Sequence, residues 1–372
     1  DGLNSEMSIF HRASWPICWL LFSAIALGCG GEKGTSIDGD SGGCETRILT
    51  GDVIIRSVLD IDALERAGGC SYAIAGDLVI TEVLVKTLDG LPDLSTVNGD
   101  VRIYNNEELQ SFDGLEDLTT IGGNVYIYDN EELTSIEGLF IQTVSGSVDI
   151  HHNEKLQDIG ALSKLVSVGG DVRIHNNTRL AHVEDLFNLE SVGGHLRIEF
   201  NPAVELIEDL SKLATVGGDF VIESNFALEI IEDISGLESV GGDLRIGGNA
   251  TLDRIEDMSR LSGVNGHLSI YSNERLTSVS GLSSLQTVGG NLNVYDNEKL
   301  TKLQGLDALT EVGSDMNIYG NDRLQSVAGL AALARVGGNF FVVDNPSLPT
   351  AEVEELAARV AQSGVSILNN GN

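Results

Sequence analysis

Hydrophobic and polar residues in this chain follow a pattern that repeats about every 24 residues. In the copy at 168–191, the apolar residues Val172 and Ile174 lie two apart, which is the period of a β-strand. Beyond Asn177 the apolar spacing becomes three, which predicts a tight, winding return rather than a second strand or a long helix. The apolar positions of this copy are Val168, Val172, Ile174, Leu180, Val183, Leu186 and Leu189. The same set recurs two copies later at Val216, Phe220, Ile222, Leu228, Ile231, Ile234 and Leu237.

An asparagine marks one equivalent place in every copy. Nine of the ten intervals between these asparagines are 24 residues long and one is 23. Such constant spacing predicts a solenoid in which each copy is one coil and successive strands lie parallel, about 4.8 Å apart. One coil has too few inward side chains to close a core, but stacked coils can share one. The residues are Asn106, Asn130, Asn153, Asn177, Asn201, Asn225, Asn249, Asn273, Asn297, Asn321 and Asn345.

The repeated asparagine is expected to face inward as an internal ladder. At the turn after each strand, backbone groups leave the sheet yet stay buried, and a carboxamide can satisfy them. It can also pair with the next coil, which avoids roughly 1–3 kcal/mol per orphaned group. Glycine pairs before the strands, such as Gly169-Gly170 and Gly193-Gly194, predict corners. No helical pattern follows them, so a phosphate-binding loop is not indicated.

The block G-D-V-x-I-x-x-N-x-x-L, followed by x-L-x-x-L-x-x-V-G-G, resembles the receptor L-domain repeat. That repeat builds the ligand-binding lobes of insulin and epidermal growth factor receptors, and bacterial surface proteins carry it too. The resemblance covers about residues 44–372. It implies a right-handed β-helix related to leucine-rich repeats, and a tendency to bind a ligand. The chain has one longer, more regular array without a cysteine-rich module or a kinase, so receptor signalling is not implied.

The N-terminal part predicts export. Residues 1–28, with Met7 as the start, read as an export signal whose apolar run is too short to span a bilayer comfortably. Ala26-Leu27-Gly28-Cys29 resembles a bacterial lipobox, which predicts a lipidated Cys29 and a membrane anchor in the cell envelope, at the outer membrane or cell surface. Ala24-Ile25-Ala26 offers an alternative cleavage site that would release a secreted protein. Residues 29–43 are glycine-rich and predict a flexible tether.

Caps are expected at both ends of the solenoid over residues 44–372. Irregular coils at 44–96 would cap the N-terminal end, where Cys44 and Cys70 predict a disulfide worth about 3–4 kcal/mol in the chain-entropy model. Regular coils follow over 97–349. A C-terminal cap at 350–372 contains the sequence TAEVEELAARVAQ, which predicts a helix with Thr350 as its N-cap. That helix is expected to shield the core and the strand edge of the last coil.

Net charge narrows the choice of partners. The chain has 56 acidic and 22 basic residues, a formal net charge of −34. This balance argues against nucleic acid or an anionic membrane surface as a partner. No Cys-x-x-Cys motif or Cys/His cluster is present, which argues against a zinc site.

Outward strand positions are expected to stack into two columns. One column reads Tyr104, Tyr128, His151, His175, Glu199, Glu223, Gly247, Tyr271, Tyr295, Tyr319 and Val343. The other, two residues earlier, includes Arg102, Tyr126, Arg173, Arg197, Arg245 and Phe341. Aromatic residues beside Arg and Asn donors predict a platform for sugar rings or an extended peptide. Alternatively, the aromatic residues only stabilise the sheet, by a few tenths to about 1 kcal/mol per pair. His151 and His175 form either a metal-binding pair or a solvated pair.

Four consecutive copies carry an acidic pair on the return side of the coil. These pairs are Glu184-Asp185, Glu208-Asp209, Glu232-Asp233 and Glu256-Asp257. Like charges stacked at about 5 Å repel one another unless they are countered. The pattern is therefore consistent with calcium bridging Glu208, Asp209, Glu232 and Asp233, or with a solvated acidic face. No other cofactor is expected.

The leading functional hypothesis is a non-enzymatic cell-surface protein for binding or scaffolding. It would present its strand face to a glycan, a cell-wall component or another protein. A purely structural envelope spacer is the first alternative. A β-helical polysaccharide-degrading enzyme is the second, but such enzymes usually have long insertions beside a few specialised coils. The largest deviation here is a single deletion between Phe140 and Thr143, and no acid pair stands apart from its copies.

Overall fold

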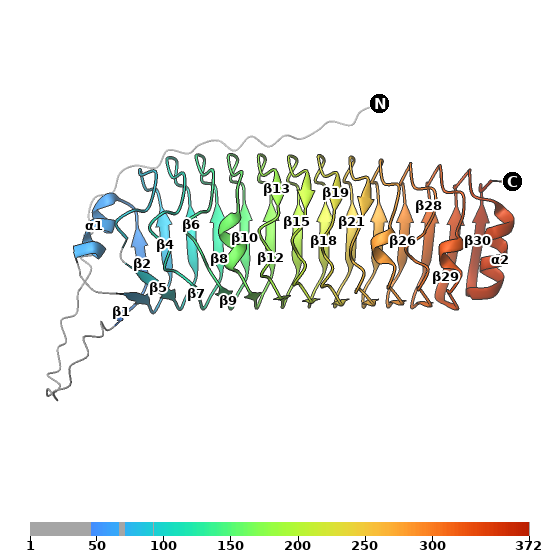
Figure 1. The fold of residues 1–372 in the computed structure, drawn as a ribbon, viewed down its shortest axis with the longest axis horizontal. Coiled ribbons are helices and arrows are strands. Elements are labelled where there is room, and N and C mark those ends of the chain that lie inside the picture. The colour runs from blue at the N-terminus through green and yellow to red at the C-terminus, as the bar shows by residue number, and fades with distance from the viewer. Residues whose placement is uncertain (1–45, 67–70, 92, 372) are drawn as a thin grey trace, which may run out of the picture. The chain divides into compact units, whose positions relative to one another are not determined.

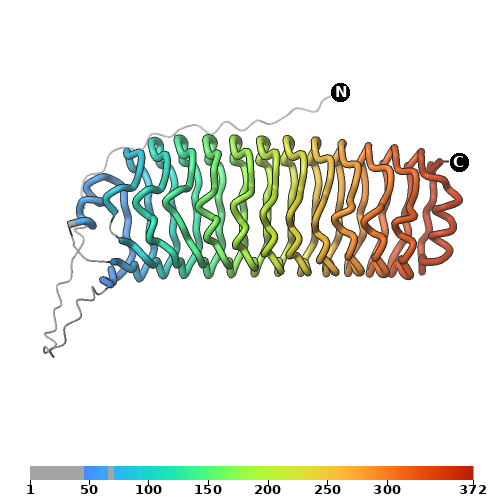
Figure 2. The backbone as a smooth tube through the Cα atoms, viewed as in Figure 1, coloured from blue at the N-terminus to red at the C-terminus, as the bar shows by residue number. Residues whose placement is uncertain are grey.

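The computed structural model describes residues 46–371, apart from 67–70 and 92. These residues wind into a parallel β-solenoid whose coils stack along one axis (Figures 1 and 2). Equivalent residues of neighbouring coils face each other, as Val172 faces Leu196 and Ile174 faces Ile198. The predicted fold class is confirmed: the chain is mainly β, with a parallel sheet and coils of about 24 residues.

Each coil has a main strand, a short strand and a return side. The main strands are β2 Val53–Ile55, β4 Leu78–Thr81, β6 Val101–Tyr104, β8 Val125–Tyr128, β10 Val148–His151, β12 Val172–His175, β15 Leu196–Glu199, β18 Phe220–Glu223, β21 Leu244–Gly247, β24 Leu268–Tyr271, β26 Leu292–Tyr295 and β28 Met316–Tyr319. The short strands are β1 Arg47–Leu49, β3 Tyr72–Ile74, β5 Leu94–Val97, β7 Thr120–Ile121, β9 Thr143–Val144, β11 Ser167–Val168, β14 Ser191–Val192, β17 Thr215–Val216, β20 Ser239–Val240, β23 Gly263–Val264, β25 Thr287–Val288 and β27 Glu311–Val312. Near the C-terminal end, β29 Arg335–Val343 and β30 Ala361–Leu368 each run through both positions.

The return side is less regular than the two strands. Its strands β13 His182–Val183, β16 Leu206–Ile207, β19 Ile230–Ile231 and β22 Arg254–Ile255 form a separate four-stranded sheet. In other coils this side carries 3₁₀ turns, at η1 Gly160–Lys164, η2 Ser280–Leu282 and η3 Ala328–Leu330. The apolar spacing of three along this side thus corresponds to short turns and bridges in most coils, as predicted, but the expectation that no second strand forms there is wrong for the four coils that carry β13, β16, β19 and β22.

Glycine forms the corner between the short strand and the main strand because neighbouring coils pass very close there. A Cβ atom added at Gly193 would lie 2.2 Å from the carbonyl oxygen of Gly169. The same distance would separate a Cβ at Gly217 from the carbonyl oxygen of Gly193. The corner interpretation of the glycine pairs is therefore confirmed.

One apolar core runs the length of the solenoid. The apolar positions expected for the copy at 168–191 all have exposed fractions of 2% or less. Those of the copy two coils later have exposed fractions of 1% or less. Each coil therefore contributes one layer to a core that its neighbours complete.

The buried asparagine ladder is confirmed, since all eleven predicted side chains have an exposed fraction of 0%. The backbone N–H of Asn177 donates to Oδ1 of Asn201 at 3.0 Å. The Nδ2 group of Asn177 donates backwards to the carbonyl oxygen of Ile150 at 2.9 Å. Each carboxamide thus satisfies an N–H and a carbonyl group of the preceding coil, as Asn177 does for Asn153 and Ile150.

The ladder contains one asparagine more than predicted, at its C-terminal end. Asn370 Oδ1 accepts hydrogen bonds from the backbone N–H and from Nδ2 of Asn345, both at 3.2 Å. At the other end, Val83 occupies the place one coil before Asn106 and donates only its backbone N–H, at 3.1 Å. The described ladder therefore runs from Asn106 to Asn370.

Helices replace the return side near both ends of the described solenoid. Helix α1 (Val58–Arg66), which the sequence did not predict, follows β2. The predicted C-terminal helix is α2 (Thr350–Val360), but Thr350 as its N-cap is wrong. The helix has no side-chain cap, because the Thr350 hydroxyl donates to the carbonyl oxygen of Gly371 at 2.8 Å.

Strand β30 follows α2 and pairs with β29, which the sequence also did not predict. Val365 and Leu368 on β30 have exposed fractions of 54% and 62%. Within the described residues, β30 has no partner strand on its other edge. The helix therefore fills the last return, and a strand forms the final edge.

Candidate functional site

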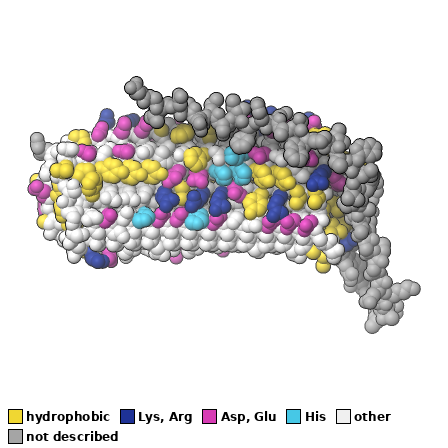
Figure 3. All heavy atoms as spheres, turned by 180° about the vertical axis from the view of Figure 1, so that it is seen from behind, with side chains coloured by type: hydrophobic (Ala, Val, Ile, Leu, Met, Phe, Trp, Pro, Cys, Tyr) yellow, Lys and Arg dark blue, Asp and Glu magenta, His cyan; other side chains and the backbone are white. Residues whose placement is uncertain are grey.

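The outward side chains of the main strands β6 to β28, with Phe341 and Val343 of β29, form one surface, called here the strand face. The register places the two predicted columns as expected, with His151 opposite His175 and Tyr295 opposite Tyr319. Figure 3 shows this face with two hydrophobic stretches separated by acidic, basic and histidine side chains. The predicted site residues are thus brought together in groups rather than in one pocket.

The aromatic residues stack in two separate groups. Tyr104, Tyr128, His151 and His175 form the first, with ring centroids 4.8–5.0 Å apart and interplanar angles of 4–12°. Tyr271, Tyr295 and Tyr319 form the second, at 4.7–5.0 Å and 6–16°. Because each ring covers the face of its neighbour, the stacks present ring edges and hydroxyl groups outward, while ring faces remain only at the stack ends. Burial raises the pKa of the Tyr128, Tyr295 and Tyr319 hydroxyls.

Three residues without rings separate the stacks: Glu199, Glu223 and Gly247. The Tyr271 ring lies over Gly247, where an added Cβ would come within 2.4 Å of it. The Tyr271 hydroxyl donates to Glu223 Oε1 at 2.8 Å. Burial and this hydrogen bond to the carboxylate raise the pKa of Tyr271.

The arginines of the strand face are already paired with aspartates. Arg173 donates to Asp171 at 2.5 Å, and Arg245 donates to Asp243 at 2.5 Å. Arg197 lies 3.3 Å from Asp219, and Arg102 binds Asp77 at 2.6 Å. The backbone N–H of Asp100 and the Arg102 guanidinium lower the pKa of Asp77. These guanidinium groups therefore offer a ligand fewer free donors than the sequence pattern suggested.

The aspartates belong to a second ladder, called here the outer ladder, which the sequence analysis missed. Asp171 Oδ1 accepts the backbone N–H of His195 at 2.7 Å, and His195 Nδ1 accepts that of Asp219 at 2.8 Å. The acceptors are Asp52, Asp77, Asp100, Asn124, Ser147, Asp171, His195, Asp219, Asp243, His267, Asn291 and Asp315. The signal in the sequence was a side chain able to accept a hydrogen bond, two residues before each arginine of the strand face.

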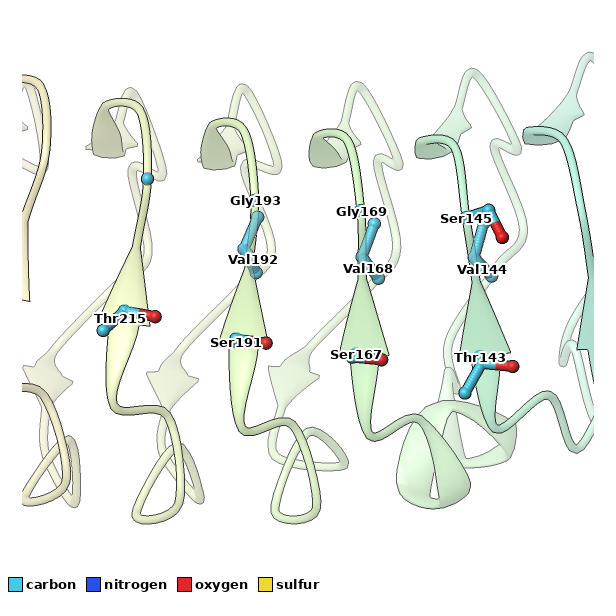
Figure 4. A pocket seen from close by; sticks show the side chains of 11 residues that line it. Thr143, Val144, Ser145, Ser167, Val168, Gly169, Ser191, Val192, Gly193 and Thr215 are labelled. Atoms are coloured by element: carbon cyan, nitrogen blue, oxygen red, sulfur yellow. The ribbon is translucent and has the colours of Figure 1, made fainter.

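A groove runs beside the outer ladder, along the short strands β9 to β17. It has a volume of about 390 Å³ and a floor that includes Gly169 and Gly193. Figure 4 shows the hydroxyl groups of Thr143, Ser167, Ser191 and Thr215 in a row on neighbouring strands. Within the described residues these hydroxyls have no hydrogen-bond partner, so they are available to a ligand. A column of Ser and Thr at the coil spacing was the signal that could have identified this groove.

His151 and His175 lie one coil apart, as predicted, and Asp149 lies beside them. The Nε2 atom of His175 is 3.2 Å from Oδ1 of Asp149. Within the described residues, only Asp149, His151 and His175 form a group of three metal-binding residue types with ligand atoms within 4.8 Å of one another. Burial lowers the pKa of His151, which favours its neutral form.

The acidic pairs of the return side stack as expected, and their turns explain part of the pattern. Asp209, Asp233 and Asp257 have φ values of 61°, 51° and 56°, where Gly114 and Gly138 in other coils also have positive φ. Burial, followed by neighbouring carboxylates, raises the pKa of Asp185, Glu208 and Asp209. In the described part of the chain, no three side chains of metal-binding type at these pairs have ligand atoms within 4.8 Å of one another. Calcium binding there stays a prediction.

The predicted export signal, tether, Cys29 lipidation and Cys44–Cys70 disulfide lie outside the described residues. Between residues 46 and 371, the described helices are all too short or too polar to cross a bilayer. The lipid anchor and the location in the cell envelope therefore stay predictions.

A long parallel solenoid with an open outward face is the architecture of a repeat protein used for binding or scaffolding. Residues 69–185 match the family model of the receptor L domain, so the resemblance expected from the repeat is confirmed over this segment. A search of curated proteins found no match to the chain. This family and the solenoid fold are typical of non-enzymatic proteins.

Proposed function

We propose that the protein is a non-enzymatic binding scaffold of the cell envelope, and that its ligand is an extended, hydroxyl-rich polymer such as a glycan. The observation that carries this proposal is the groove between Thr143 and Thr215, with its row of hydroxyls that have no partner among the described residues. Hydroxyl groups both donate and accept hydrogen bonds, which suits the many hydroxyls of a sugar chain. The row follows the solenoid axis, so a long ligand would meet the same chemistry on successive coils.

The strand face supports an extended ligand in a second way. The ring edges of Tyr271, Tyr295 and Tyr319 line up along the same axis as the groove hydroxyls. Stacked rings offer edges rather than faces along the column, so hydroxyl contacts are favoured over stacking of sugar rings there. Because the groove is open and extends over several coils, it favours a polymer over a small molecule.

The test is binding of the full chain to a glycan array and to isolated cell-wall polysaccharide. One variant removes groove hydroxyls, with Ser167, Ser191 and Thr215 changed to Val. A second changes Tyr271, Tyr295 and Tyr319 to Ala. The matched control changes Thr277, Thr301 and Gln325 to Ala, on the return side of the same three coils as the tyrosines.

Binding by the wild type and the control, with loss in the groove variant, would support the proposal. Loss only in the tyrosine variant would place the site on the strand face instead. Binding unchanged in both variants would exclude this surface, and absence of any binding would favour the structural spacer. Shortening of a bound polymer would revive the polysaccharide-degrading enzyme.

A further inference from the structure

Asp149, His151 and His175 occupy neighbouring places on two paired strands. Asp149 and His151 lie two residues apart on β10, so both side chains point out of the same face of the sheet. His175 on β12 is the direct cross-strand partner of His151. The fold therefore brings one carboxylate and two imidazoles together without any cysteine motif in the sequence.

Among the described residues, the carboxylate of Asp149 is not paired with an arginine, whereas the carboxylates of Asp171 and Asp243 are. Its cross-strand neighbour is Arg173, but Arg173 donates to Asp171 at 2.5 Å. The Oδ1 atom of Asp149 is buried and has no hydrogen-bond partner within the described residues. Its 3.2 Å distance from His175 Nε2 is short, but the two groups are not aligned as a hydrogen bond. An unpaired buried oxygen beside two imidazoles requires an explanation.

We infer that Asp149, His151 and His175 form a binding site for a zinc-type dication on the strand face. Two imidazoles and one carboxylate are ligands that zinc accepts, whereas calcium prefers oxygen ligands alone. In tetrahedral zinc sites the bonds are about 2.0–2.2 Å long, which places ligand atoms roughly 3.3 Å apart. The pair formed by His175 Nε2 and Asp149 Oδ1 already has this separation.

Binding requires one change in the histidine stack. The rings of His151 and His175 lie 4.8 Å apart with an interplanar angle of 12°. A nitrogen lone pair lies in the plane of its ring, so two parallel rings do not aim at one ion. Rotation of the His175 ring about its Cβ–Cγ bond would remove this obstacle, because Nε2 lies close to the rotation axis and stays near Asp149 while the contact of His151 with His152 is kept.

His152 provides a neighbouring contact that can hold His151 in place. The Nδ1 atoms of His151 and His152 are 2.8 Å apart, so the N–H of one ring donates a hydrogen bond to the nitrogen of the other. Such a hydrogen bond fixes the tautomer of a metal-binding histidine and orients its ring. Three protein ligands would leave a fourth position open to water or to a group of a bound partner.

The experiment is titration of the full chain with Zn²⁺ by calorimetry in chelator-free buffer, with Co²⁺ absorption as a second measurement. The variants are His151→Ala, His175→Ala and Asp149→Asn. The control is His182→Ala, since His182 lies on the return side and outside the cluster. Far-UV circular dichroism without metal verifies that each variant is folded.

We expect one Zn²⁺ per chain, with affinity reduced at least about tenfold by each of the three site variants and unchanged by His182→Ala. Co²⁺ should give the visible absorption of a tetrahedral site in the wild type, a result that does not depend on any variant folding. Absence of both Zn²⁺ binding and the Co²⁺ spectrum would overturn the inference. Zn²⁺ binding that persists in a folded His151→Ala/His175→Ala double variant would overturn it too. Glycan binding is measured separately, so either result leaves the proposed function to its own test.

Discussion

The hydroxyl of Tyr271 donates a hydrogen bond to Glu223, which lies two coils away along the solenoid. The tyrosine ring crosses the intervening coil at Gly247, whose missing side chain leaves room for it. The bond is 2.8 Å long and its acceptor is a carboxylate, so it ties together coils that share no direct strand pairing. Gly247 therefore interrupts the aromatic column in order to admit a polar contact.

Removal of this hydroxyl is expected to weaken the centre of the solenoid. Tyr271→Phe should lower the free energy of unfolding by about 1 kcal/mol, because Glu223 loses its donor. Urea unfolding followed by far-UV circular dichroism measures the change. Tyr319→Phe is the matched control, since its hydroxyl has no partner in the described part of the chain. Equal losses in the two variants would show that the Glu223 contact adds nothing.

The asparagine ladder predicts a large difference between a central and a terminal position. Asn201→Ala would orphan the backbone N–H of Asn177 and the carbonyl oxygen of Ile174, at about 1–3 kcal/mol for each group. Asn370→Ala should cost less, because Asn370 is only partly buried and water can replace it. Native-state hydrogen exchange at the Asn177 amide reports the first loss directly. Unchanged protection of that amide in Asn201→Ala would contradict the ladder.

The corner glycines predict a second contrast. In Gly193→Ala the new Cβ would lie 2.2 Å from a backbone oxygen that cannot move away, so we expect a loss of about 3 kcal/mol. In Gly263→Ala the nearest atom is the Thr287 hydroxyl oxygen at 3.2 Å, so stability should stay the same or rise by about 0.5 kcal/mol. Thermal unfolding of the two variants checks this order, and similar melting temperatures would show that coil spacing does not require glycine.

The acidic pairs predict a dependence of stability on pH. Burial and the carboxylates of Asp233 and Glu184 raise the pKa of Asp209 in the folded state. The folded state therefore holds this proton to a higher pH than the unfolded chain, so stability falls as pH rises through that range. Asp209→Asn keeps a residue that tolerates the positive φ and should add a few tenths to about 1 kcal/mol at pH 7.

This gain should disappear as the pH falls through the range in which the Asp209 carboxyl of the wild type becomes protonated. Asp296→Asn is the control, because Asp296 also has a positive φ of 56° but lies outside the stacked acidic pairs. Urea unfolding at several pH values separates the two variants. A constant gain from pH 4 to pH 7 would refute the repulsion between coils.

The core and the inner ladder were predictable because their residue types hardly vary from coil to coil. Asn370 was missed because helix α2 lies between it and Asn345 and lengthens the interval between them to 25 residues, so Asn370 does not follow the 24-residue spacing. The outer ladder was missed because Asp, Asn, Ser and His share only the ability to accept a hydrogen bond. The pairing of Arg173 with Asp171 could not be predicted from the sequence either, since it depends on the side-chain conformation of Arg173. That Asp149 lacks a partner among the described residues becomes evident only once this conformation of Arg173 is known.

Both ladders connect each coil only to its immediate neighbours, with an offset of 23 to 25 residues along the chain. A load that pulled the two ends of the solenoid apart would therefore act on these contacts in series, and the weakest coil would open first. Each rupture would release the 24 residues that separate Asn177 from Asn201, or roughly 80 Å of extended chain. Single-molecule extension would record that length as the interval between successive force peaks, so the array would lengthen in steps under tension rather than fail at once.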